Sequence, residues 1–474
     1  MLSDFFAKII KQHFDYTPTE SQEKLINILG NFVRGENDTQ LLLIKGFAGT
    51  GKTTVISAFV KALEQLKLKS ILLAPTGRAA KVISSYSKKP AYTIHKKIYR
   101  QKSLKEAFSK FLLDKNLHSE TFFIVDEASM ISNESNDASI FGSGKLLDDL
   151  IEYVYTGKKC KLILVGDTAQ LPPVGISISP ALDRAELTNY NLELIEVFLP
   201  EVVRQSLDSG ILFNATQIRN LIDNRIFAGR FPKLTLKNYC DIEKINGAEL
   251  IEKISECYDK FGREETMIVT RSNKQANKYN AGIRKSILYR EEEISTGDLL
   301  MIVKNNYHWL KKDECADFIA NGDIAEIVKI FNYEERYEKR FVDIRIRLID
   351  FDDTEIDAKV MLDTLTIETA SLNEEENRKL FYAVSEDYTE IDNRKKRNEA
   401  VREDAFFNAL QIKFAYSVTC HKAQGGQWKA IFVDQGWITE DRVDVEYLRW
   451  LYTAITRSTE KLYLVNFKDD FFEN

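Results

Sequence analysis

The sequence predicts an α/β protein built on parallel β-sheets, with a small antiparallel β-barrel in its second half. Short apolar runs that end in small or acidic residues alternate with helical segments, a pattern typical of parallel sheets whose ligands lie at the carboxyl ends of the strands. Three such runs are "SILLAPTGRAA", "TFFIVDEASM" and "KLILVGDTAQLPPVG". From about residue 288 to 411 the pattern changes to closely spaced alternating runs such as "GDLLMIVKN" and "NGDIAEIVKI", which predicts the barrel.

Composition indicates a globular chain in a reducing compartment. The 474 residues include 44% hydrophobic side chains, enough to bury several cores. The five cysteines are widely separated and form no C-x-x-C pair, so neither a disulfide framework nor a zinc site is expected. No apolar run approaches membrane-spanning length, and charged residues interrupt the segment "MLSDFFAKIIKQHF", which predicts an amphipathic helix rather than a signal peptide. We therefore expect a soluble, cytoplasmic protein that does not bind a membrane.

Positive charge is concentrated in one segment, although the net charge is −6. Between residues 81 and 105 there are eight Lys or Arg side chains and no Asp or Glu, and Tyr86, Tyr92 and Tyr99 lie among them. Basic residues attract nucleic-acid phosphates and aromatic rings stack on bases. A solvated basic face is an equally good interpretation of this run alone. Acidic residues concentrate elsewhere, in segments such as "NEEENRK" and "SEDYTEID".

The segment "KGFAGTGKTT", residues 45–54, has the spacing of a phosphate-binding P-loop. Its small residues let backbone N–H groups surround phosphate oxygens, Lys52 can reach the β- and γ-phosphates, and the Thr53 hydroxyl can bind Mg²⁺. Apolar residues at helical spacing follow between 55 and 63, so the loop opens onto a helix N-terminus, which favours phosphate. ATP and Mg²⁺ are therefore the expected cofactors. The expected nucleotide-binding residues of the loop are Gly46, Ala48, Gly49, Thr50, Gly51, Lys52, Thr53 and Thr54.

Two further strand ends carry polar groups suited to phosphoryl transfer. In "TFFIVDEAS" an apolar strand is followed by Asp126 and Glu127. One of these carboxylates can hold Mg²⁺ and the other can orient or deprotonate the attacking water. Since Mg²⁺ prefers few carboxylates together with phosphate oxygens, Thr53 and Asp126 form the expected metal site. In "VGDTAQLPPVG" the neutral amide of Gln170 can hydrogen-bond the γ-phosphate or the attacking water, although a structural turn explains that stretch equally well.

The motifs and their order resemble superfamily 1 helicases of the RecD and Dda kind, and the resemblance covers nearly the whole chain. Besides the P-loop and "VDEASM", it is carried by "TPTESQEKLI", "LAPTGRAA", "YTIHKKIY", "GDTAQLPPVG", "LPEVVRQ", "MIVTRSNKQANKYN", "SVTCHKAQGGQW" and "LYTAITRSTEKLYLV". It implies two RecA-like motor domains, each with a smaller inserted domain. The expected boundaries are 1–84 and 119–195 for the first motor, 85–118 for its inserted wedge domain, 196–287 and 412–474 for the second motor, and 288–411 for the barrel with a charged helical extension.

The resemblance also implies roles for residues that spacing alone does not single out. Gln22 resembles the glutamine that reads the adenine edge, which an amide can do with one donor and one acceptor. Arg204 in "VVRQ" and Arg457 in "AITRS" resemble arginines that the second motor extends to the γ-phosphate, whose spread charge suits a planar guanidinium. Gln427 stands where many relatives have a carboxylate, so its role stays open. The expected catalytic residues are Lys52, Asp126, Glu127, Gln170, Arg204 and Arg457.

A second set of motif residues resembles those that hold a single DNA strand across both motors. Hydroxyl groups, a lysine and helix N-termini suit phosphate contacts, which carry no sequence information. For the two histidines of this set, a hydrogen-bonded structural role is the alternative interpretation. The set consists of Pro75, Thr76 and Arg78 in "APTGRAA", Thr93 and His95 in "YTIHKK", and Thr419, His421 and Lys422 in "VTCHKAQG".

The inserted segments raise two further expectations. Related enzymes split the duplex with a hairpin at the position of the first insertion, so Phe108 or Phe111 is the candidate wedge residue, unless either is a core residue. Residues 373–404 are expected to form charged helices. These are either a solvated surface with i,i+4 charge pairs or an added arm that meets a partner.

Together these expectations favour an ATP-dependent DNA helicase that moves 5′ to 3′ on single-stranded DNA and unwinds duplexes at single-strand/double-strand junctions. The direction follows from the resemblance alone. Two alternatives stay open: an RNA helicase or nucleoprotein remodeller on the same scaffold, and a partner-dependent ATPase subunit of a recombination or repair nuclease that does not unwind alone. The chain is expected to be monomeric, with replication or repair proteins as candidate partners.

Overall fold

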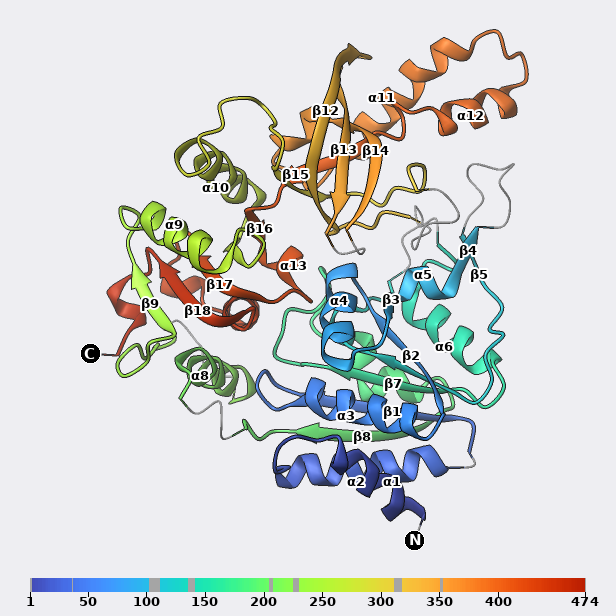
Figure 1. The fold of residues 1–474 in the computed structure, drawn as a ribbon, viewed down its shortest axis with the longest axis vertical. Helices are drawn as coiled ribbons and strands as arrows, with labels where there is room; N and C mark the ends of the chain where they lie inside the picture. The colour runs from blue at the N-terminus through green and yellow to red at the C-terminus, as the bar shows by residue number, and fades with distance from the viewer. Residues whose placement is uncertain are drawn as a thin grey trace.

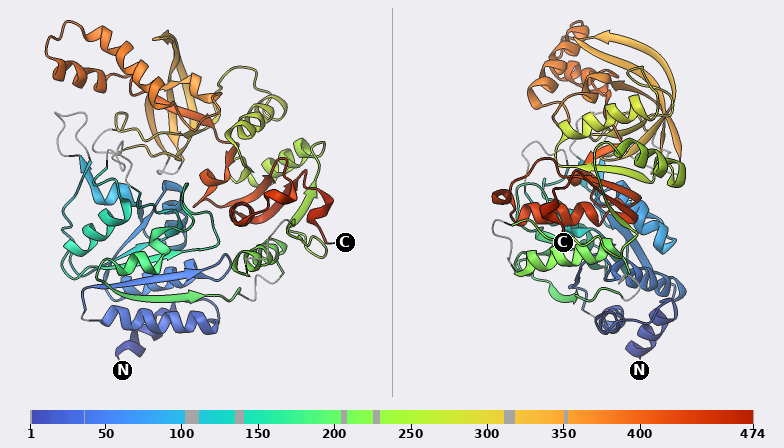
Figure 2. Two further views of the ribbon diagram at one scale, coloured as in Figure 1. Left: turned by 180° about the vertical axis from the view of Figure 1, so that it is seen from behind. Right: turned by 90° about the vertical axis from the view of Figure 1, so that its left-hand side faces the viewer.

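The computed structural model describes residues 2–35, 37–101, 111–134, 141–203, 208–224, 230–310, 318–349 and 353–473. These residues form two parallel sheets flanked by helices and one closed β-barrel (Figure 1). The first sheet lies at the base with the N-terminus, the second lies beside it with the C-terminus, and the barrel forms the top (Figure 2). The predicted fold class, two RecA-like α/β motor domains with an inserted barrel, is confirmed.

Six parallel strands form the first sheet, in the spatial order β3 (Ala91–Thr93), β2 (Lys69–Ala74), β6 (Thr121–Val125), β7 (Lys161–Gly166), β1 (Gln40–Gly46) and β8 (Glu193–Leu199). Strands β6 and β7 are buried along their whole length, because helices cover both faces of the sheet. On one face, Val55 and Phe59 of α3 belong to the same buried cluster as Leu42, and on the other Leu147 of α6 belongs to the same buried cluster as Leu43. The helices of this domain are α1 (Leu2–Gln12), α2 (Glu20–Arg34), α3 (Lys52–Gln65), α4 (Gly77–Ser87), α5 (Ile94–Ile98), α6 (Leu146–Thr156) and α7 (Arg184–Thr188).

Five parallel strands form the second sheet, in the spatial order β16 (Ser417–Thr419), β10 (Thr266–Thr270), β17 (Trp428–Asp434), β18 (Ser458–Val465) and β9 (Ile242–Ile245). Helix α14 (Val445–Ile455) lies between β17 and β18 in the chain, and its Leu448 and Leu451 are fully buried in the core of this domain. The other helices are α8 (Gly210–Asn224), α9 (Leu250–Phe261), α10 (Asn273–Ser286) and α13 (Cys420–Ala423).

The barrel consists of β11 (Leu299–Ile302), β12 (Ile324–Arg336), β13 (Lys339–Leu348), β14 (Thr354–Met361) and β15 (Leu410–Phe414). Gly297 and Gly322 lie in turns of this barrel region and have φ values of 78° and 96°, which glycine adopts without strain. Between β14 and β15 the chain forms an arm of two helices, α11 (Glu374–Ser385) and α12 (Arg394–Glu403), that projects from the barrel (Figure 1). The expected i,i+4 charge pair is present on α11, where Lys379 lies 2.7 Å from Glu375.

The segment inserted in the first domain contains a two-stranded antiparallel sheet, β4 (Tyr99–Gln101) and β5 (Phe111–Leu113). The candidate wedge Phe108 lies outside the described residues. Phe111 is 7% exposed, and its ring lies 5.0 Å from that of Phe141 and 4.6 Å from that of Tyr307. Phe111 is therefore a core residue, and its prediction as a wedge is wrong, because a buried ring cannot stack on a base pair.

Strand pairing places two boundaries a few residues from those expected. β3 pairs with β2, so that Thr93 lies opposite Ala74, and the insertion therefore begins after Thr93 rather than at residue 85. β8 pairs with β1 as far as Leu199, so the first sheet runs past residue 195. Among the described helices, none has the length and apolar character needed to cross a membrane.

Candidate active site

The P-loop connects β1 to α3 in a conformation that needs its glycines. Gly49 and Gly51 have φ values of 75° and 79°, in the left-handed region that side chains with a Cβ rarely adopt. A Cβ atom on Gly51 would lie 2.5 Å from Nε2 of Gln22, so close packing also excludes a larger residue. The Thr50 hydroxyl donates to the Phe47 carbonyl oxygen at 2.8 Å and stabilises the turn.

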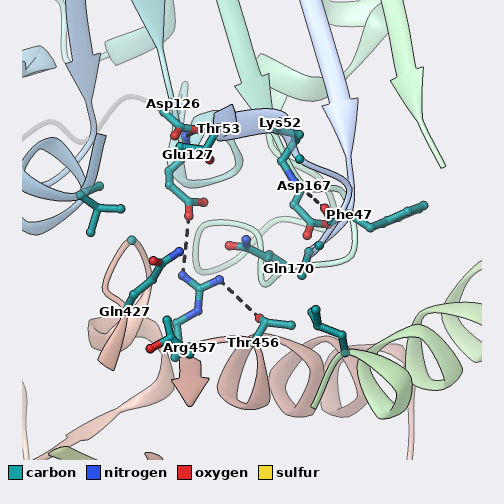
Figure 3. Close-up of a pocket in the computed structure, with 18 of the residues that line it drawn as sticks. Phe47, Lys52, Thr53, Asp126, Glu127, Asp167, Gln170, Gln427, Thr456 and Arg457 are labelled. Carbon is teal, nitrogen blue, oxygen red and sulfur yellow. Dashed lines mark hydrogen bonds and ion pairs between the residues drawn. The ribbon is translucent and has the colours of Figure 1, made fainter. Parts of the chain in front are cut away.

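Lys52 begins α3 and points back over the loop (Figure 3). Its ammonium donates to the carbonyl oxygens of Gly46 and Phe47, both at 2.8 Å. Thr53 and Thr54 follow in the first helical turn, where backbone N–H groups have no acceptor within the helix and create positive potential. Lys52, Thr53 and Thr54 line the same cleft, and an ammonium, hydroxyls and backbone donors are the groups that bind phosphate.

Asp126 and Glu127 directly follow β6, as predicted. Glu127 has a φ of 53°, and its N–H donates to Oδ1 of Asp126 at 2.9 Å. Burial raises the pKa of Asp126 to about 6 and the Glu127 carboxylate adds to the rise, while Lys52 and Arg457 oppose it. The protein therefore stabilises the ionised form of Asp126 less well than water does, and a bound cation would stabilise that form.

Arg457 enters the same cleft from the second domain. It follows α14, is 3% exposed, and its Nη1 lies 3.6 Å from Oε1 of Glu127 (Figure 3). Its Nε donates to the Thr453 carbonyl oxygen at 3.1 Å and its Nη1 to the Gly426 carbonyl oxygen at 3.3 Å. With its amide nitrogen facing the carboxylate, Gln170 donates to Glu127 at 3.3 Å and accepts from Nη2 of Arg457 at 3.1 Å. A carboxylate, an amide and a cation from opposite domains are therefore in contact.

These groups line one cleft of about 340 Å³ between the two α/β domains. Arg204, which was also predicted to act here, lies outside the described residues. The predicted residues that line the cleft are Ala48, Gly49, Gly51, Lys52, Thr53, Thr54, Asp126, Glu127, Gln170 and Arg457. Residues that sequence analysis did not single out for this site also line it: Tyr86, Asp167, Ser209, Leu212 and Thr456.

Asp167 and Tyr452 form a contact that sequence analysis missed. Asp167 follows β7 and is 1% exposed, and its Oδ2 accepts from the Tyr452 hydroxyl at 2.7 Å. Burial raises the pKa of Asp167. The oxygen of the Tyr452 hydroxyl accepts from the Ala48 N–H at 2.8 Å. The sequence offered one indication of this contact: Asp167 lies in the same motif as Gln170, and Tyr452 lies in the same motif as Arg457.

The two glutamines of uncertain role occupy different surroundings. Gln22 is 2% exposed, its amide oxygen accepts from the Thr19 N–H at 3.0 Å, and its amide nitrogen donates to the Thr50 carbonyl oxygen at 2.9 Å. Gln22 therefore joins α2 to the P-loop, and a contact with the adenine edge stays a prediction. Gln427 lines the cleft, where its Oε1 accepts from the Tyr86 hydroxyl at 3.4 Å.

The donors of the cleft fit a magnesium nucleotide. The P-loop and Lys52 offer N–H donors to phosphate oxygens, while Thr53 and Asp126 offer the hard oxygen ligands that Mg²⁺ prefers. Mg²⁺ keeps several water and phosphate ligands, so two protein ligands suffice.

The predicted DNA-binding residues of the first domain follow the neighbouring strands β2 and β3. Thr76 caps α4 by accepting from the Ala79 N–H at 3.2 Å, and Thr93 caps α5 by accepting from the Lys96 N–H at 3.2 Å. Pro75 directly precedes Thr76. Both helix N-termini thus lie at the carboxyl edge of the sheet, where ligands of such sheets bind.

Two other residues of this set are engaged by the protein itself. The Arg78 guanidinium lies 4.4 Å from the ring centroid of Trp428, which belongs to the second domain. The His95 ring lies 4.8 Å from that of Phe141, and burial lowers the pKa of His95 to about 4. His95 is therefore neutral at physiological pH and cannot supply a positive charge to a phosphate.

The corresponding residues of the second domain surround the start of α13. Thr419 is its N-cap residue and His421 lies exposed in its first turn. The Lys422 ammonium is buried without a hydrogen-bond partner among the described residues, and burial lowers the pKa of Lys422 to about 8. Because an unpaired buried ammonium is costly, this group suits an anionic ligand. A Cβ atom on Gly425 would lie 3.1 Å from Oγ1 of Thr76, so the motifs of the two domains meet here.

Two family models match the chain: an AAA domain at residues 31–176 and a UvrD-like helicase C-terminal domain at residues 414–465. The ATP-dependent DNA helicase Dda of Enterobacteria phage T4 is 26% identical over 339 residues, which cover 69% of this chain and 70% of Dda. An uncharacterized protein of Acanthamoeba polyphaga mimivirus is 27% identical over 521 residues, which cover 93% of this chain and 98% of that protein. The ATP-dependent DNA helicase RecD2 of Deinococcus radiodurans is 30% identical over 179 residues, which cover 36% of this chain and 21% of RecD2.

Solved structures of Pif1 helicases also align with the chain. The Bacteroides Pif1 complex with ADP-AlF3 and single-stranded DNA aligns with 97% of this chain and 95% of its own, at 14% identity and a TM-score of 0.46. Pif1 from Candida albicans aligns with 96% of both chains, at 15% identity and a TM-score of 0.45. The order of the motifs, the two family models and the sequence relatives agree, and all of them show that the chain is similar to superfamily 1 helicases of the RecD/Dda-like group.

Proposed function

We propose that this helicase hydrolyses ATP with Mg²⁺ to move 5′ to 3′ along single-stranded DNA and to unwind the duplex ahead of it. The observation that carries the proposal is the 3.6 Å approach of Arg457 to Glu127. Because the two side chains belong to different α/β domains, a change at the γ-phosphate between them changes how well the domains fit together. Hydrolysis is thereby coupled to relative motion of the two motors.

In this proposal the first domain binds the nucleotide and activates water. The P-loop N–H groups and Lys52 hold the β- and γ-phosphates. Mg²⁺, when bound by Thr53 and Asp126, neutralises phosphate charge. Glu127 accepts the proton of the attacking water, and Gln170 orients that water.

The second domain supplies positive charge to the transferred group. Arg457, and Arg204 by resemblance, donate to the equatorial oxygens of the γ-phosphate, where charge is spread in the transition state. In the described structure Arg457 is close to Glu127. A γ-phosphate competes for the same guanidinium, so nucleotide binding releases Glu127 to act as a base. The order of these events makes hydrolysis depend on closure of the cleft.

The proposed track for DNA crosses both domains near the contact of Gly425 with Thr76. Helix N-termini at Thr76, Thr93 and Thr419, and the ammonium of Lys422, suit a phosphate backbone. Two of the relatives are named as DNA helicases, which supports DNA rather than RNA as the substrate. The 5′-to-3′ direction rests on the resemblance to RecD and Dda. We further propose that the protein acts as a cytoplasmic monomer in replication, recombination or repair.

The test compares ATP hydrolysis without polymer, with single-stranded DNA and with single-stranded RNA, followed by unwinding of duplexes that carry a 5′ or a 3′ tail. We expect strong stimulation by DNA and unwinding only from the 5′ tail, and neither activity in Lys52→Ala. Stimulation by RNA would support the remodeller instead. ATP hydrolysis without unwinding of either duplex would support the partner-dependent subunit, and unwinding from the 3′ tail would refute the direction.

A further inference from the structure

One side chain of the second domain reaches into the P-loop of the first. Tyr452 lies in α14, five residues before Arg457. Although it belongs to the second domain, its hydroxyl lies between the P-loop and the end of β7, and the residue is 1% exposed. The proposed reaction gives no role to this hydroxyl.

The Tyr452 hydroxyl joins two groups of the first domain. Its oxygen accepts from the Ala48 N–H at 2.8 Å, and its proton is donated to Oδ2 of Asp167 at 2.7 Å. Ala48 belongs to the loop that surrounds the phosphates, and Asp167 precedes Gln170 by three residues. A phenol can donate one hydrogen bond and accept another at the same time. Both partners therefore depend on one oxygen atom that comes from the opposite domain.

Thr453, next to Tyr452, and Gln424, at the end of α13, add two further contacts between the domains. The Leu171 N–H donates to the Thr453 hydroxyl at 2.9 Å, and Nε2 of Gln424 donates to the Leu171 carbonyl oxygen at 2.6 Å. The last turn of α14 is thus attached to the first domain at the P-loop, at the end of β7 and at the loop that follows it.

This last turn also carries Arg457. Nε of Arg457 donates to the Thr453 carbonyl oxygen at 3.1 Å. The Thr456 N–H donates to the Tyr452 carbonyl oxygen at 3.1 Å. The guanidinium is therefore anchored to the residue that follows Tyr452, so a shift of this turn moves the arginine in the cleft.

We propose that Tyr452 is a positioning residue, whose hydroxyl holds the last turn of α14 against the P-loop and Asp167 and so places Arg457 at the γ-phosphate. The inference rests on the proposed function, because it assumes that Arg457 acts on ATP. The ground-state contacts of ADP come from the first domain, whereas Arg457 acts mainly on the transition state. Loss of the Tyr452 hydroxyl should therefore lower kcat more than it weakens nucleotide binding.

The test compares Tyr452→Phe with Tyr447→Phe, both of which remove one hydroxyl and keep the ring. Tyr447 is a matched control because it lies in the same helix, is 2% exposed, and its hydroxyl donates to Gln435 within the second domain. For each protein we measure kcat and KM of DNA-stimulated ATP hydrolysis, and the affinities for ADP and for ADP with aluminium fluoride, an analogue of the transition state.

For Tyr452→Phe we expect kcat to fall by about threefold to tenfold, as for the loss of one or two buried hydrogen bonds. The affinity for the aluminium fluoride complex should fall by a similar factor, while KM and the affinity for ADP change by less than about twofold. Tyr447→Phe should keep the wild-type kcat. The ratio of the two affinities does not depend on the fraction of folded protein, so it remains informative if a variant is partly unfolded.

Wild-type kcat in Tyr452→Phe, equal loss of both affinities, or the same loss of kcat in Tyr447→Phe would each overturn the inference. A wild-type protein that does not hydrolyse ATP, or is not stimulated by DNA, would overturn the proposed function instead. The two failures are therefore distinguishable in one series of measurements.

Discussion

Asp126→Asn is expected to abolish ATP hydrolysis and at the same time to stabilise the folded protein. The substitution removes the carboxylate proposed to bind Mg²⁺, so hydrolysis should be lost. It keeps an oxygen that can accept from the Glu127 N–H, a bond of 2.9 Å in the structure. It also removes a charge that burial and the adjacent Glu127 carboxylate make unfavourable, as the pKa of about 6 indicates.

The size of the effect follows from the pKa of Asp126. A carboxyl whose pKa rises from 3.8 to about 6 on folding lowers the free energy of unfolding at pH 7 by at most about 3 kcal/mol, at about 1.4 kcal/mol per pH unit. Below about pH 4 the group is protonated in both states and contributes no penalty. The penalty develops as pH rises to about 6 and is constant above it. Asp126→Asn should therefore gain stability between about pH 4 and pH 6 and keep the gain at neutral pH.

Calorimetry of the apo protein between pH 4 and pH 8 tests this reasoning. At pH 7.5 the transition of the first domain should rise by on the order of 5 °C in Asp126→Asn, and the difference from wild type should disappear near pH 4. Asp148→Asn is the control: although burial opposes it, hydrogen bonds from Tyr190 and Asn133 lower the pKa of Asp148, so this change should not stabilise. The reasoning is refuted if Asp126→Asn is no more stable than wild type at pH 7.5, or if its gain is independent of pH.

Two further predictions concern the motor cycle. Arg457→Ala should lower kcat by about 10³-fold or more while nucleotide still binds, because an arginine in this position stabilises the charge of the transition state. Steady-state ATPase assays, together with a nucleotide-binding measurement as the control, test this. An unchanged kcat would show that Arg457 does not have this role. Affinity for single-stranded DNA should fall steeply between about 50 and 200 mM salt and vary little with base composition, because the proposed contacts are to phosphates. Titrations of labelled oligonucleotides measure this affinity. A complex that is insensitive to salt and selective for sequence would contradict the proposed DNA track.

Local sequence patterns were sufficient to predict much of the fold and the side of the cleft that the first domain forms. The P-loop, its following helix and the carboxylates after β6 lie in short contiguous stretches, and each stretch combines a strand or helix pattern with a recognisable polar group. The barrel was predicted from closely spaced alternating runs, and the structure confirms it. The pairing of Arg457 with the first domain came only from resemblance, because no local pattern relates residue 457 to residue 127.

The sequence by itself therefore determined the strands, the helices and the chemical groups at strand ends, because these depend on neighbours within a few residues. Tertiary structure decided which groups meet. Tyr452 contacts Ala48, 404 residues away, and Asp167, 285 residues away, and Arg78 lies on Trp428. It also decided that Phe111 is buried, since the rings that cover it, Phe141 and Tyr307, come from distant segments. The physical reason is that hydrophobic periodicity specifies which face of an element is buried, whereas the partner that covers it depends on the packing of the whole chain.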